Sequence, residues 1–430
     1  MRYQERTAQE GFFGSSTPSA KLPVKANTTL RETAGAVGGA RSGHPGHGRQ
    51  SVPAAEADEV IVVSSPESCP DCGGVLQEQV YRERTVVDVQ PLRRQTIHYQ
   101  LEQKYCPRCR RKVRPRAPGV FKRSLLGNRL LAHVAVQHYV FGVTLGQLEV
   151  QLGVGNGALH GAMHQLAQRL EPACGPLVAE YRQGAVKHAD ETSWRTDGRN
   201  GYAWLFCSEK ISLFRFRQTR SGQVAQEVFG PEPLSGVLVV DRYAGYNGAP
   251  CQVQYCYAHL LREVQDLEKE FPQELEVQVF SSLLAPLLAA AMQLRARGLL
   301  AEAFRVQADK LKEQIVYWTE NVANHPGVQR IQNIFRENSA RLYHWAQDPQ
   351  VPADNNFAER ALRPLVIARK ISFGSQSEKG ARTREVLMSI LHTLRKRGGD
   401  TTALFARALD QLAAHDALSP YDALFKIDSS

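Results

Sequence analysis

The chain has 430 residues, 43% of them hydrophobic, which is too long for one small core and predicts two to four domains. Its formal net charge of +10 and its isoelectric point near 9.2 favour a polyanionic partner, nucleic acid before an anionic membrane. No apolar segment follows the opening "MRYQERTAQE", and the longest apolar run, residues 283–294, is too short to cross a bilayer. The sequence therefore argues against a signal peptide and a membrane protein and predicts a cytoplasmic one.

Residues 1–58 are rich in Gly, Ser, Pro, Ala and Thr, and we expect them to form a disordered basic tail. Two histidines of "GGARSGHPGHGR", His44 and His47, have side chains that can bind a metal. The composition favours a flexible basic segment over a metal site.

Two C-x-x-C pairs follow within residues 59–120, with Cys69 and Cys72 in "CPDC" and Cys106 and Cys109 in "CPRC". Eight cysteines in a cytoplasmic chain are more typical of thiols or metal ligands than of disulfides. Two thiolates on one turn can reach a single ion, so two such turns predict a four-cysteine zinc ribbon with one structural Zn²⁺. Two disulfides or two redox pairs are the alternatives.

The residues around the second pair predict a strand and a surface for DNA. Apolar and aromatic residues alternate along "QTIHYQLEQKY", which predicts a strand with one such face: Ile97, Tyr99, Leu101 and Tyr105. Residues 101–130 contain ten Lys or Arg and one acidic residue. A solvated charge run is one interpretation, but beside a zinc ribbon a phosphate-facing surface is at least as good. The candidate DNA contacts here are Arg108, Arg110, Arg111 and Lys112.

Residues 121–182 are predicted to be a helical DNA-binding region. "TLGQLEVQLGVGNGALHGAMHQLAQRL" contains a helix, a break with Gly153 and Gly155, and a second helix that Asn156 caps. The expected apolar faces are Leu145, Leu148, Val150 and Leu152 in the first helix, and Leu159, Met163, Leu166 and Leu170 in the second. This pattern is typical of a helix-turn-helix, although glycine turns between helices are common in other folds.

From residue 183 the pattern changes to strands. "GAVKHADETSW", "GYAWLFCSE" and "ISLFRFRQTR" are β-rich, "SGQVAQEVFG" is a short helix, and "GVLVVDRYAGY" and "VQYCYAHLLREVQDL" each begin with a strand. This order predicts a ribonuclease H-like mixed sheet flanked by helices. The fold class is therefore α/β and multidomain, with the zinc ribbon and helical region before the sheet. The expected segments are the first part of the core (183–265), a helical insertion (266–352), the last part of the core (353–398) and a C-terminal helical appendage (399–430).

Two aspartates occupy informative positions in this order. Asp190 is expected at the end of the first strand, and Asp241 ends the buried strand "GVLVV". The two strands are neighbours in a ribonuclease H-like sheet, so the carboxylates should meet and repel unless a cation lies between them. Mg²⁺ or Mn²⁺ suits such oxygen ligands, and two ions ~3.5–4 Å apart would suit phosphoryl transfer.

The stretch "DNNFAERALRPLVIARK" supplies a third acid, Glu359, on a helix that we expect to pack on the sheet. Asp354, Asn355 or Asn356 can cap this helix, and Pro364 should stop or kink it. The surrounding cations are expected to face DNA phosphates: Arg360, Arg363, Arg369 and Lys370. The alternative is an ordinary capped helix with a Glu359–Arg363 pair that contributes a few tenths of a kcal/mol.

Taken together, "SGHPGHGR", the two cysteine pairs, "HADETSWR", "VVDRYAGY", "CYAHLLR" and "DNNFAERALRPLVIARKISFGS" resemble the bacterial insertion sequence 66 family of transposases, over roughly residues 40–398. The resemblance implies a DDE-type transposase whose catalytic acids match Asp190, Asp241 and Glu359. It also implies double-stranded DNA (element ends and target) as partner, a homo-oligomer in the synaptic complex, accessory proteins of the element, and a nucleoid-associated location.

His259, in "CYAHLLR", is a further candidate catalytic residue that touches the scissile phosphate or orients an acid. Cys256 and His259 have metal-ligand spacing, but no second pair lies nearby in the sequence, and a polar residue at a helix start is the plain alternative. For the whole chain, two other functions stay open. One is a non-catalytic, decayed or domesticated DNA-binding protein, and the other is a hydrolase with a carboxylate pair, such as a glycosidase.

Overall fold

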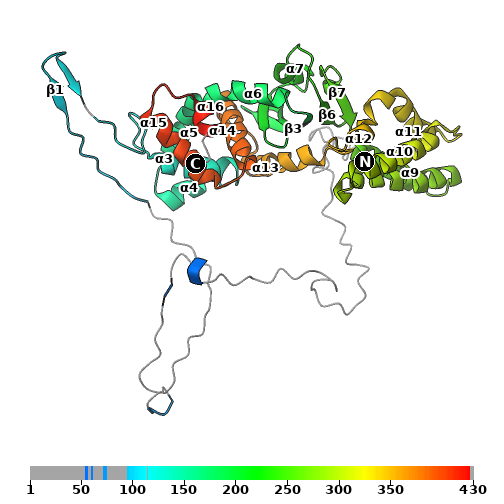
Figure 1. Cartoon of the computed structure of the whole chain (residues 1–430), viewed down its shortest axis with the longest axis horizontal. Coiled ribbons are helices and arrows are strands. Elements are labelled where there is room, and N and C mark those ends of the chain that lie inside the picture. The colour runs from blue at the N-terminus through cyan, green and yellow to red at the C-terminus, as the bar shows by residue number, and fades with distance from the viewer. Residues whose placement is uncertain (1–53, 57–59, 62–70, 75–93, 114, 427–430) are drawn as a thin grey trace. The chain divides into compact units, whose positions relative to one another are not determined.

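The computed structural model describes residues 54–56, 60–61, 71–74, 94–113 and 115–426 (Figure 1). The chain divides into two compact units, one formed by residues 23–96 and the other by residues 1–22 and 97–430. In the first unit the described residues include a short 3-10 helix, Ala54–Glu56. The predicted basic tail lies almost wholly outside the described residues.

A mixed five-stranded sheet forms the centre of the larger unit, as predicted. Its strands are β3 (Val186–Thr196), β4 (Arg199–Cys207), β5 (Ser212–Arg217), β6 (Val237–Val240) and β7 (Gln252–Tyr255), in the order β5-β4-β3-β6-β7. The first three strands form an antiparallel meander, whereas β6 runs parallel to both β3 and β7. All four residues of β6 are buried, because helices and loops cover both faces of the sheet there.

Gly236 fixes the entry into β6. Its φ of +77° is in the left-handed region, and a Cβ at this position would lie 2.1 Å from the carbonyl oxygen of Ala185. Only glycine fits this close approach of two backbones, which brings β6 alongside the start of β3.

Helix α14 (Glu378–Lys396) covers the edge strand β5 in an unusual way. Three of its side chains accept the outward backbone N–H groups of β5 in the pairs Phe216–Glu385 (3.2 Å), Phe214–Ser389 (2.9 Å) and Ser212–Thr393 (3.0 Å). Four residues span about 6 Å along a helix, and two residues span about 6.6 Å along a strand. Side chains four residues apart on α14 can therefore reach N–H groups two residues apart on β5. The helix thereby satisfies an edge that would otherwise be open to pairing.

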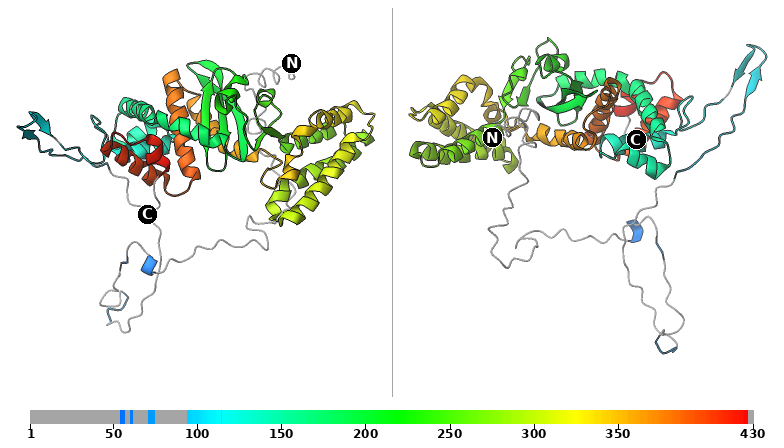
Figure 2. Two further views of the ribbon diagram at one scale, coloured as in Figure 1. Left: turned by 45° about the horizontal axis from the view of Figure 1, so that its top comes forward. Right: turned by 180° about the vertical axis from the view of Figure 1, so that it is seen from behind.

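The remaining helices form two groups beside the sheet. Before it come α3 (Asn128–Tyr139), α4 (Leu145–Leu152), α5 (Asn156–Leu170) and α6 (Cys174–Arg182), and α15 (Thr401–Ala414) and α16 (Pro420–Phe425) join this group from the C-terminus. The second group is α8 (Tyr257–Glu270), α9 (Leu275–Leu294), α10 (Ala301–Glu320), α11 (Pro326–Glu337) and α12 (His344–Gln347). Figure 2 shows the second group at the far end of the sheet from the first. Two more helices are α7 (Gln223–Phe229), between β5 and β6, and α13 (Asn356–Ser372), which packs on β3 and β4.

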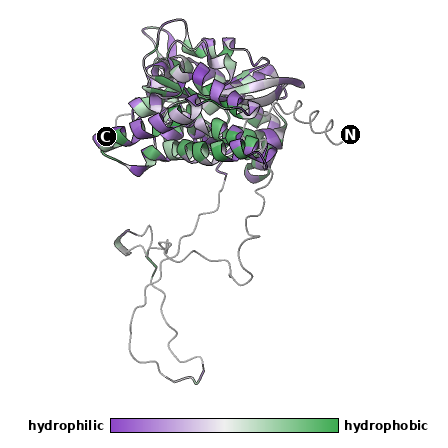
Figure 3. Cartoon of the chain, turned by 90° about the vertical axis from the view of Figure 1, so that its right-hand side faces the viewer, coloured by the Kyte–Doolittle hydropathy of each residue, from purple (hydrophilic) through white to green (hydrophobic). Residues whose placement is uncertain are grey.

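Within the described part of the chain, one helical segment, Leu275–Arg297, is long and apolar enough to cross a membrane by length and composition alone. It packs against α8, α10 and α11. Figure 3 views the molecule from this end, where green apolar and purple polar residues are mixed along the helices.

Several local predictions were wrong. The expected strand over residues 95–105 is confined to β1 (Lys104–Cys106), which pairs with β2 (Arg111–Val113), and Ile97 is exposed. Val150 is 85% exposed, because it lies off the face that buries Leu145, Leu148 and Leu152. Gly155, not Asn156, is the N-cap of α5. The turn at Gly153, with φ of +60°, is as predicted.

Candidate active site

Asp190 and Asp241 lie on neighbouring strands at the same level of the sheet. The parallel pairing of β3 with β6 includes the pair His188–Val239, and continuing that register by two residues sets Asp190 opposite Asp241. Asp190 is in the middle of β3 and not at its end as predicted, because β3 goes on pairing with β4 to Thr196. Asp241 directly follows β6, and its Oδ1 accepts the N–H of Tyr243 (3.0 Å), which closes a tight turn.

The surroundings of Asp190 disfavour its charge. Burial raises the pKa of Asp190 well above its ordinary value, and the negative charges of Glu191, Asp241 and Glu359 raise it further. One interaction works in the other direction, the hydrogen bond from the backbone N–H of Glu191 to Asp190 Oδ1 (2.9 Å). Four carboxyl groups therefore gather here, with three of them raising the pKa of the fourth.

Glu191 differs from Asp190 in having its own cation, and sequence reasoning missed it. Arg220 Nε donates to Glu191 Oε1 (3.0 Å), and the hydroxyl of Tyr246 donates to Oε2. The Arg220 guanidinium also lies over the ring of Tyr243, 4.0 Å from its centroid, and Tyr243 in turn donates to Asp241. Glu191 and Arg220 thus form a neutral pair that contacts the turn carrying Asp241. In the sequence, the two consecutive acidic residues of "HADET" are the feature that could have drawn attention to Glu191.

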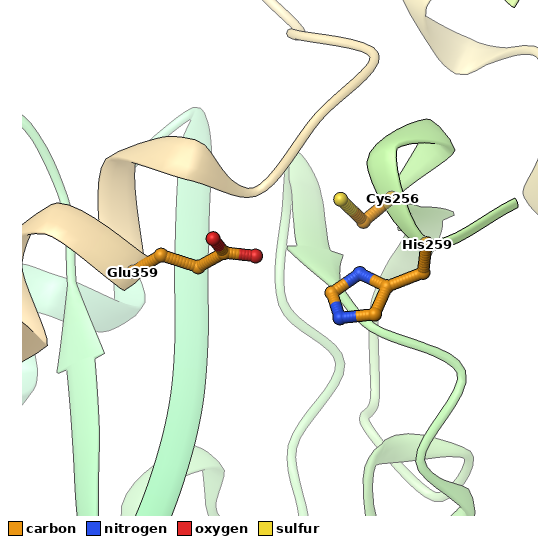
Figure 4. A group of neighbouring side chains, drawn as sticks. All are labelled: Cys256, His259 and Glu359. Atoms are coloured by element: carbon orange, nitrogen blue, oxygen red, sulfur yellow. The ribbon is translucent and has the colours of Figure 1, made fainter. Parts of the chain in front are cut away.

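Glu359 lies in the first turn of α13 and faces the start of α8 (Figure 4). Its Oε1 is buried and has no hydrogen-bond partner among the described residues. Burial raises the pKa of Glu359, and the strongest opposing charge is that of Arg262 on α8. Within the described residues no ion pair joins Glu359 to Arg363, so the pair that the ordinary-helix alternative requires is not formed.

Asn355 fixes the position of Glu359 relative to the strands. Its backbone N–H donates to the sulfur of Cys256 (3.1 Å), and its side-chain Nδ2 donates to the carbonyl oxygen of Ala189 (2.8 Å). Its Oδ1 lies 3.0 Å from Nδ1 of His188. Asn355 is the N-cap residue by position, yet its side chain makes no cap bond. The sequence predicted a local role, whereas its partners are more than 95 residues away.

The start of α13 is also tied to the ends of β6 and β7. The N–H of Cys256 donates to the carbonyl of Val240 (2.8 Å), and the N–H of Tyr257 donates to that of Ala353 (2.8 Å). These bonds place residues that precede α13 beside the beginning of α8, next to Asp241. Helix α13 itself continues through Pro364 to Ser372, so of the two predicted effects, a stop or a kink, Pro364 does not produce the stop.

Glu359 belongs to two candidate groups of metal ligands. The oxygen ligands of Asp190, Asp241 and Glu359 suit Mg²⁺ or Mn²⁺, and the unpartnered Oε1 of Glu359 leaves an acceptor for a cation. Within the described residues, however, the group whose ligand atoms all lie within 4.8 Å of one another is Cys256, His259 and Glu359. Thiol and imidazole suit Zn²⁺ better than Mg²⁺, but burial raises the pKa of Cys256 to about 12 and so opposes its thiolate.

The predicted DNA contacts divide into exposed and structural residues. Arg360, Arg363 and Lys370 are exposed on α13. Arg369 is half-buried, and its Nη1 donates to Thr192 Oγ1 (2.9 Å) and to the carbonyl of Ser193 (2.7 Å). These bonds tie α13 to β3, and the assignment of Arg369 to DNA stays a prediction. The other four candidates are exposed on the β1–β2 hairpin: Arg108, Arg110, Arg111 and Lys112.

The predicted zinc site is only partly within the described residues. Cys69 lies outside them, and Cys72 belongs to a different unit from Cys106 and Cys109. Hydrogen bonds from Cys109 and from the backbone of Arg108 lower the pKa of Cys106, which is the arrangement of a turn that presents N–H groups to a thiolate. The four-cysteine zinc ribbon stays a prediction.

Comparisons with known proteins cover most of the chain. The model of the Transposase IS66 family matches residues 123–383. Three relatives from Sinorhizobium fredii are similar over most of their length. "Uncharacterized protein y4qI" is 26% identical over 86% of this chain and 76% of its own, "Uncharacterized protein y4jD" 23% over 83% and 76%, and "Uncharacterized protein y4hP" 21% over 85% and 74%.

Proposed function

We propose, since the chain belongs to the IS66 family of transposases, that it binds the ends of a bacterial insertion sequence and cuts and joins DNA there as a DDE-type enzyme. The observation that carries the proposal is the placement of Asp190 opposite Asp241, with the charge of Glu359 raising the pKa of Asp190. Carboxyl groups that oppose one another's ionisation are typical of a site built for a cation.

The sheet supports a ribonuclease H-like core. An antiparallel meander, β3 to β5, is followed by two strands parallel to β3, and the first strand occupies the middle of the sheet. The helices α8 to α12 separate β7 from α13 in sequence, yet α13 packs back on β3 and β4. We propose that α8 to α12 are an insertion placed before the helix that supplies the last acid.

Asp190, Asp241 and Glu359 would hold two Mg²⁺ or Mn²⁺ ions, which would activate the attacking oxygen and offset charge on the leaving oxygen when bound. Water attacks phosphorus at the element end, the bond from phosphorus to O3′ breaks, and a 3′-hydroxyl is released. That hydroxyl then attacks a target phosphodiester and displaces the target O3′. His259 lies beside Glu359, so we assign it to orienting that carboxylate, while the Glu191–Arg220 pair holds the turn of Asp241.

The exposed cations of α13 and of the β1–β2 hairpin are proposed to bind phosphates without reading sequence. We expect the protein to act as a homo-oligomer on paired element ends, with accessory proteins of the element as further partners. The structural Zn²⁺ belongs to the proposed ribbon, where four thiolates leave no open coordination position for chemistry.

A nicking assay on DNA that contains the element's ends tests the proposal. Nicking should require Mg²⁺ or Mn²⁺ and should fail on DNA of scrambled ends. Binding to the ends without nicking at any divalent concentration would favour the second candidate, a non-catalytic DNA-binding protein. The placement of the three acids argues against that candidate.

A further inference from the structure

A buried arginine without an acidic partner lies away from the catalytic acids. Arg384, on α14, is 7% exposed, and none of the ion pairs between described residues includes it. Its guanidinium lies 5.3 Å from the ring centroids of Tyr139 and Trp194. A buried charge is costly unless an opposite charge or several hydrogen bonds compensate it, and arginine does not escape this cost by losing its proton.

Among the described residues, the neighbours of Arg384 supply no negative charge. Its Nη1 contacts Met388 Sδ (4.0 Å), and its Nη2 lies 3.3 Å from Nε2 of His138. Because Nδ1 of His138 donates to the carbonyl of Val143 (2.8 Å), Nε2 is the lone-pair acceptor for Arg384. Burial and the charge of Arg384 lower the pKa of His138 to about 4, so this imidazole is neutral at pH 7.

Arg384 faces a pocket of about 230 Å³ between α3, α4, α5, α13 and α14. Its lining includes Thr144, Asn156, His160 and Ile371. His160 lines the pocket, and burial followed by the charges of Lys379 and His160 lowers the pKa of His164, one turn further along α5. The carboxylate of Glu149 on α4 accepts the N–H of Asn156 (3.1 Å) at the start of α5.

We propose that this pocket is a phosphate-binding site and that a phosphate of duplex DNA occupies it, an assignment that rests on the proposed function. A phosphate oxygen would supply the missing negative charge and accept donors that Arg384 does not use within the protein.

The exposed face of α13 connects this pocket to the active site. Arg360, Arg363, Ile367, Lys370 and Ile371 are exposed at spacings of three, four, three and one residues, which places them along one side of the helix. Glu359 and Ile371 are 12 residues apart, about 18 Å along the axis. At 3.4 Å per base pair, the bound phosphate would be about five base pairs from the scissile one.

Thermal unfolding in phosphate tests the site in the full-length protein. Sodium phosphate should raise the Tm of the wild type above its value in sodium chloride of equal ionic strength, and Arg384→Met should lose this difference. Ile371→Glu, which puts a carboxylate at the exposed mouth of the pocket, should also lose this difference in Tm. Because Ile371 is exposed, this variant does not require the protein core to accept a substitution. Two exposed positions on α10 give matched controls, Arg305→Met and Val306→Glu, which should respond to phosphate as the wild type does.

The salt dependence of binding to duplex DNA tests the source of the phosphate. Loss of one phosphate contact should reduce the slope of log K against log [salt] by about 0.9 in both pocket variants. A wild type that phosphate does not stabilise, or pocket variants whose slope is unchanged, would overturn the assignment to DNA phosphate. If the wild type nicks DNA although those results overturn the phosphate site, only this inference fails and the transposase proposal stands. If the phosphate effects hold but no ends are nicked, the transposase proposal fails and the anion site stands.

Discussion

Replacing Asp190 by Asn should stabilise the protein while abolishing its activity. Burial and three neighbouring carboxyl groups raise the pKa of Asp190 well above its ordinary value. The folded state therefore binds this proton more tightly than the unfolded state does. The contribution of Asp190 to the free energy of unfolding is most favourable at pH values where it is protonated in both the folded and the unfolded protein. This contribution falls as the pH rises from the pKa of Asp190 in the unfolded chain towards its pKa in the folded protein.

The magnitude follows from linkage. Each unit by which folding raises the pKa of Asp190 costs about 1.4 kcal/mol of folding free energy at a pH where the group is ionised in the unfolded chain. Each kcal/mol corresponds to roughly 2–4 °C in Tm for a domain of about 150–250 residues. Asn keeps the shape and can still accept the N–H of Glu191, so the variant loses the penalty without losing that hydrogen bond.

The assay is thermal unfolding at pH 5 and pH 8, in EDTA and in Mg²⁺, with nicking measured on the same samples. In EDTA the Tm of the wild type should fall between pH 5 and pH 8, and Asp190→Asn should melt several degrees higher than the wild type at pH 8. Mg²⁺ should raise the Tm of the wild type more than that of the variant, because the ion neutralises the carboxylates.

Asp197→Asn is a matched control at the exposed turn between β3 and β4, where both residues tolerate the φ of +52°. It should change neither Tm nor nicking. An Asp190→Asn protein that melts at or below the wild type at pH 8 and nicks DNA normally would refute the reasoning, because Asp190 would then be a structural residue.

Three other predictions concern separate parts of the chain. Glu359→Gln should lower nicking by several orders of magnitude while DNA binding persists or tightens slightly and the Tm is no lower than that of the wild type, as gel shift and melting on one sample would show. Glu385→Ala should reduce the free energy of unfolding by about 1–3 kcal/mol in a urea titration, because it leaves the buried N–H of Phe216 on β5 without its acceptor, whereas Arg217 keeps its ion pair with Glu227 (2.8 Å). The purified protein should contain about one zinc ion per chain under reducing conditions, and Cys106→Ser should reduce it below half, by metal analysis.

Much of the sheet could be predicted because each strand has a local signature. The four apolar residues of β6 and the apolar and aromatic residues of β4 and β5 lie between turn residues, and these patterns depend only on neighbours in the sequence. The position of Asp190 within β3 could not be predicted in the same way. It depends on the length over which β3 pairs with β4 rather than β6, and that pairing is set by residues far along the chain.

The contact of Arg369 with β3 could have been predicted from helical periodicity. Ala358, Leu362 and Leu365 are buried on α13, and Arg369 continues their spacing of four, three and four residues. The same spacing places Arg369 on a different side of the helix from Arg360, Arg363 and Lys370, which face solvent. By contrast, nothing local in "DNNFAER" shows that Asn355 contacts Ala189 and Cys256, because those contacts exist only once β3, β7 and α13 have come together.

The distribution of charge leads to a last prediction about DNA binding. The chain has a net charge of +10 and exposed cations along α13, yet the carboxyl groups of Asp190, Glu191, Asp241 and Glu359 gather at one place on the sheet. Exposed cations attract DNA whether or not an ion is bound, but the acids repel a phosphate that approaches the active centre without one. Removing one of these negative charges should therefore reduce the repulsion of the phosphate, as a bound metal ion would. At pH 8, at low salt and in EDTA, Asp190→Asn should bind element-end DNA more tightly than the wild type, and saturating Mg²⁺ should remove most of the difference. Equal affinities in EDTA would show that the DNA backbone stays away from these acids, and the site would then need a different substrate.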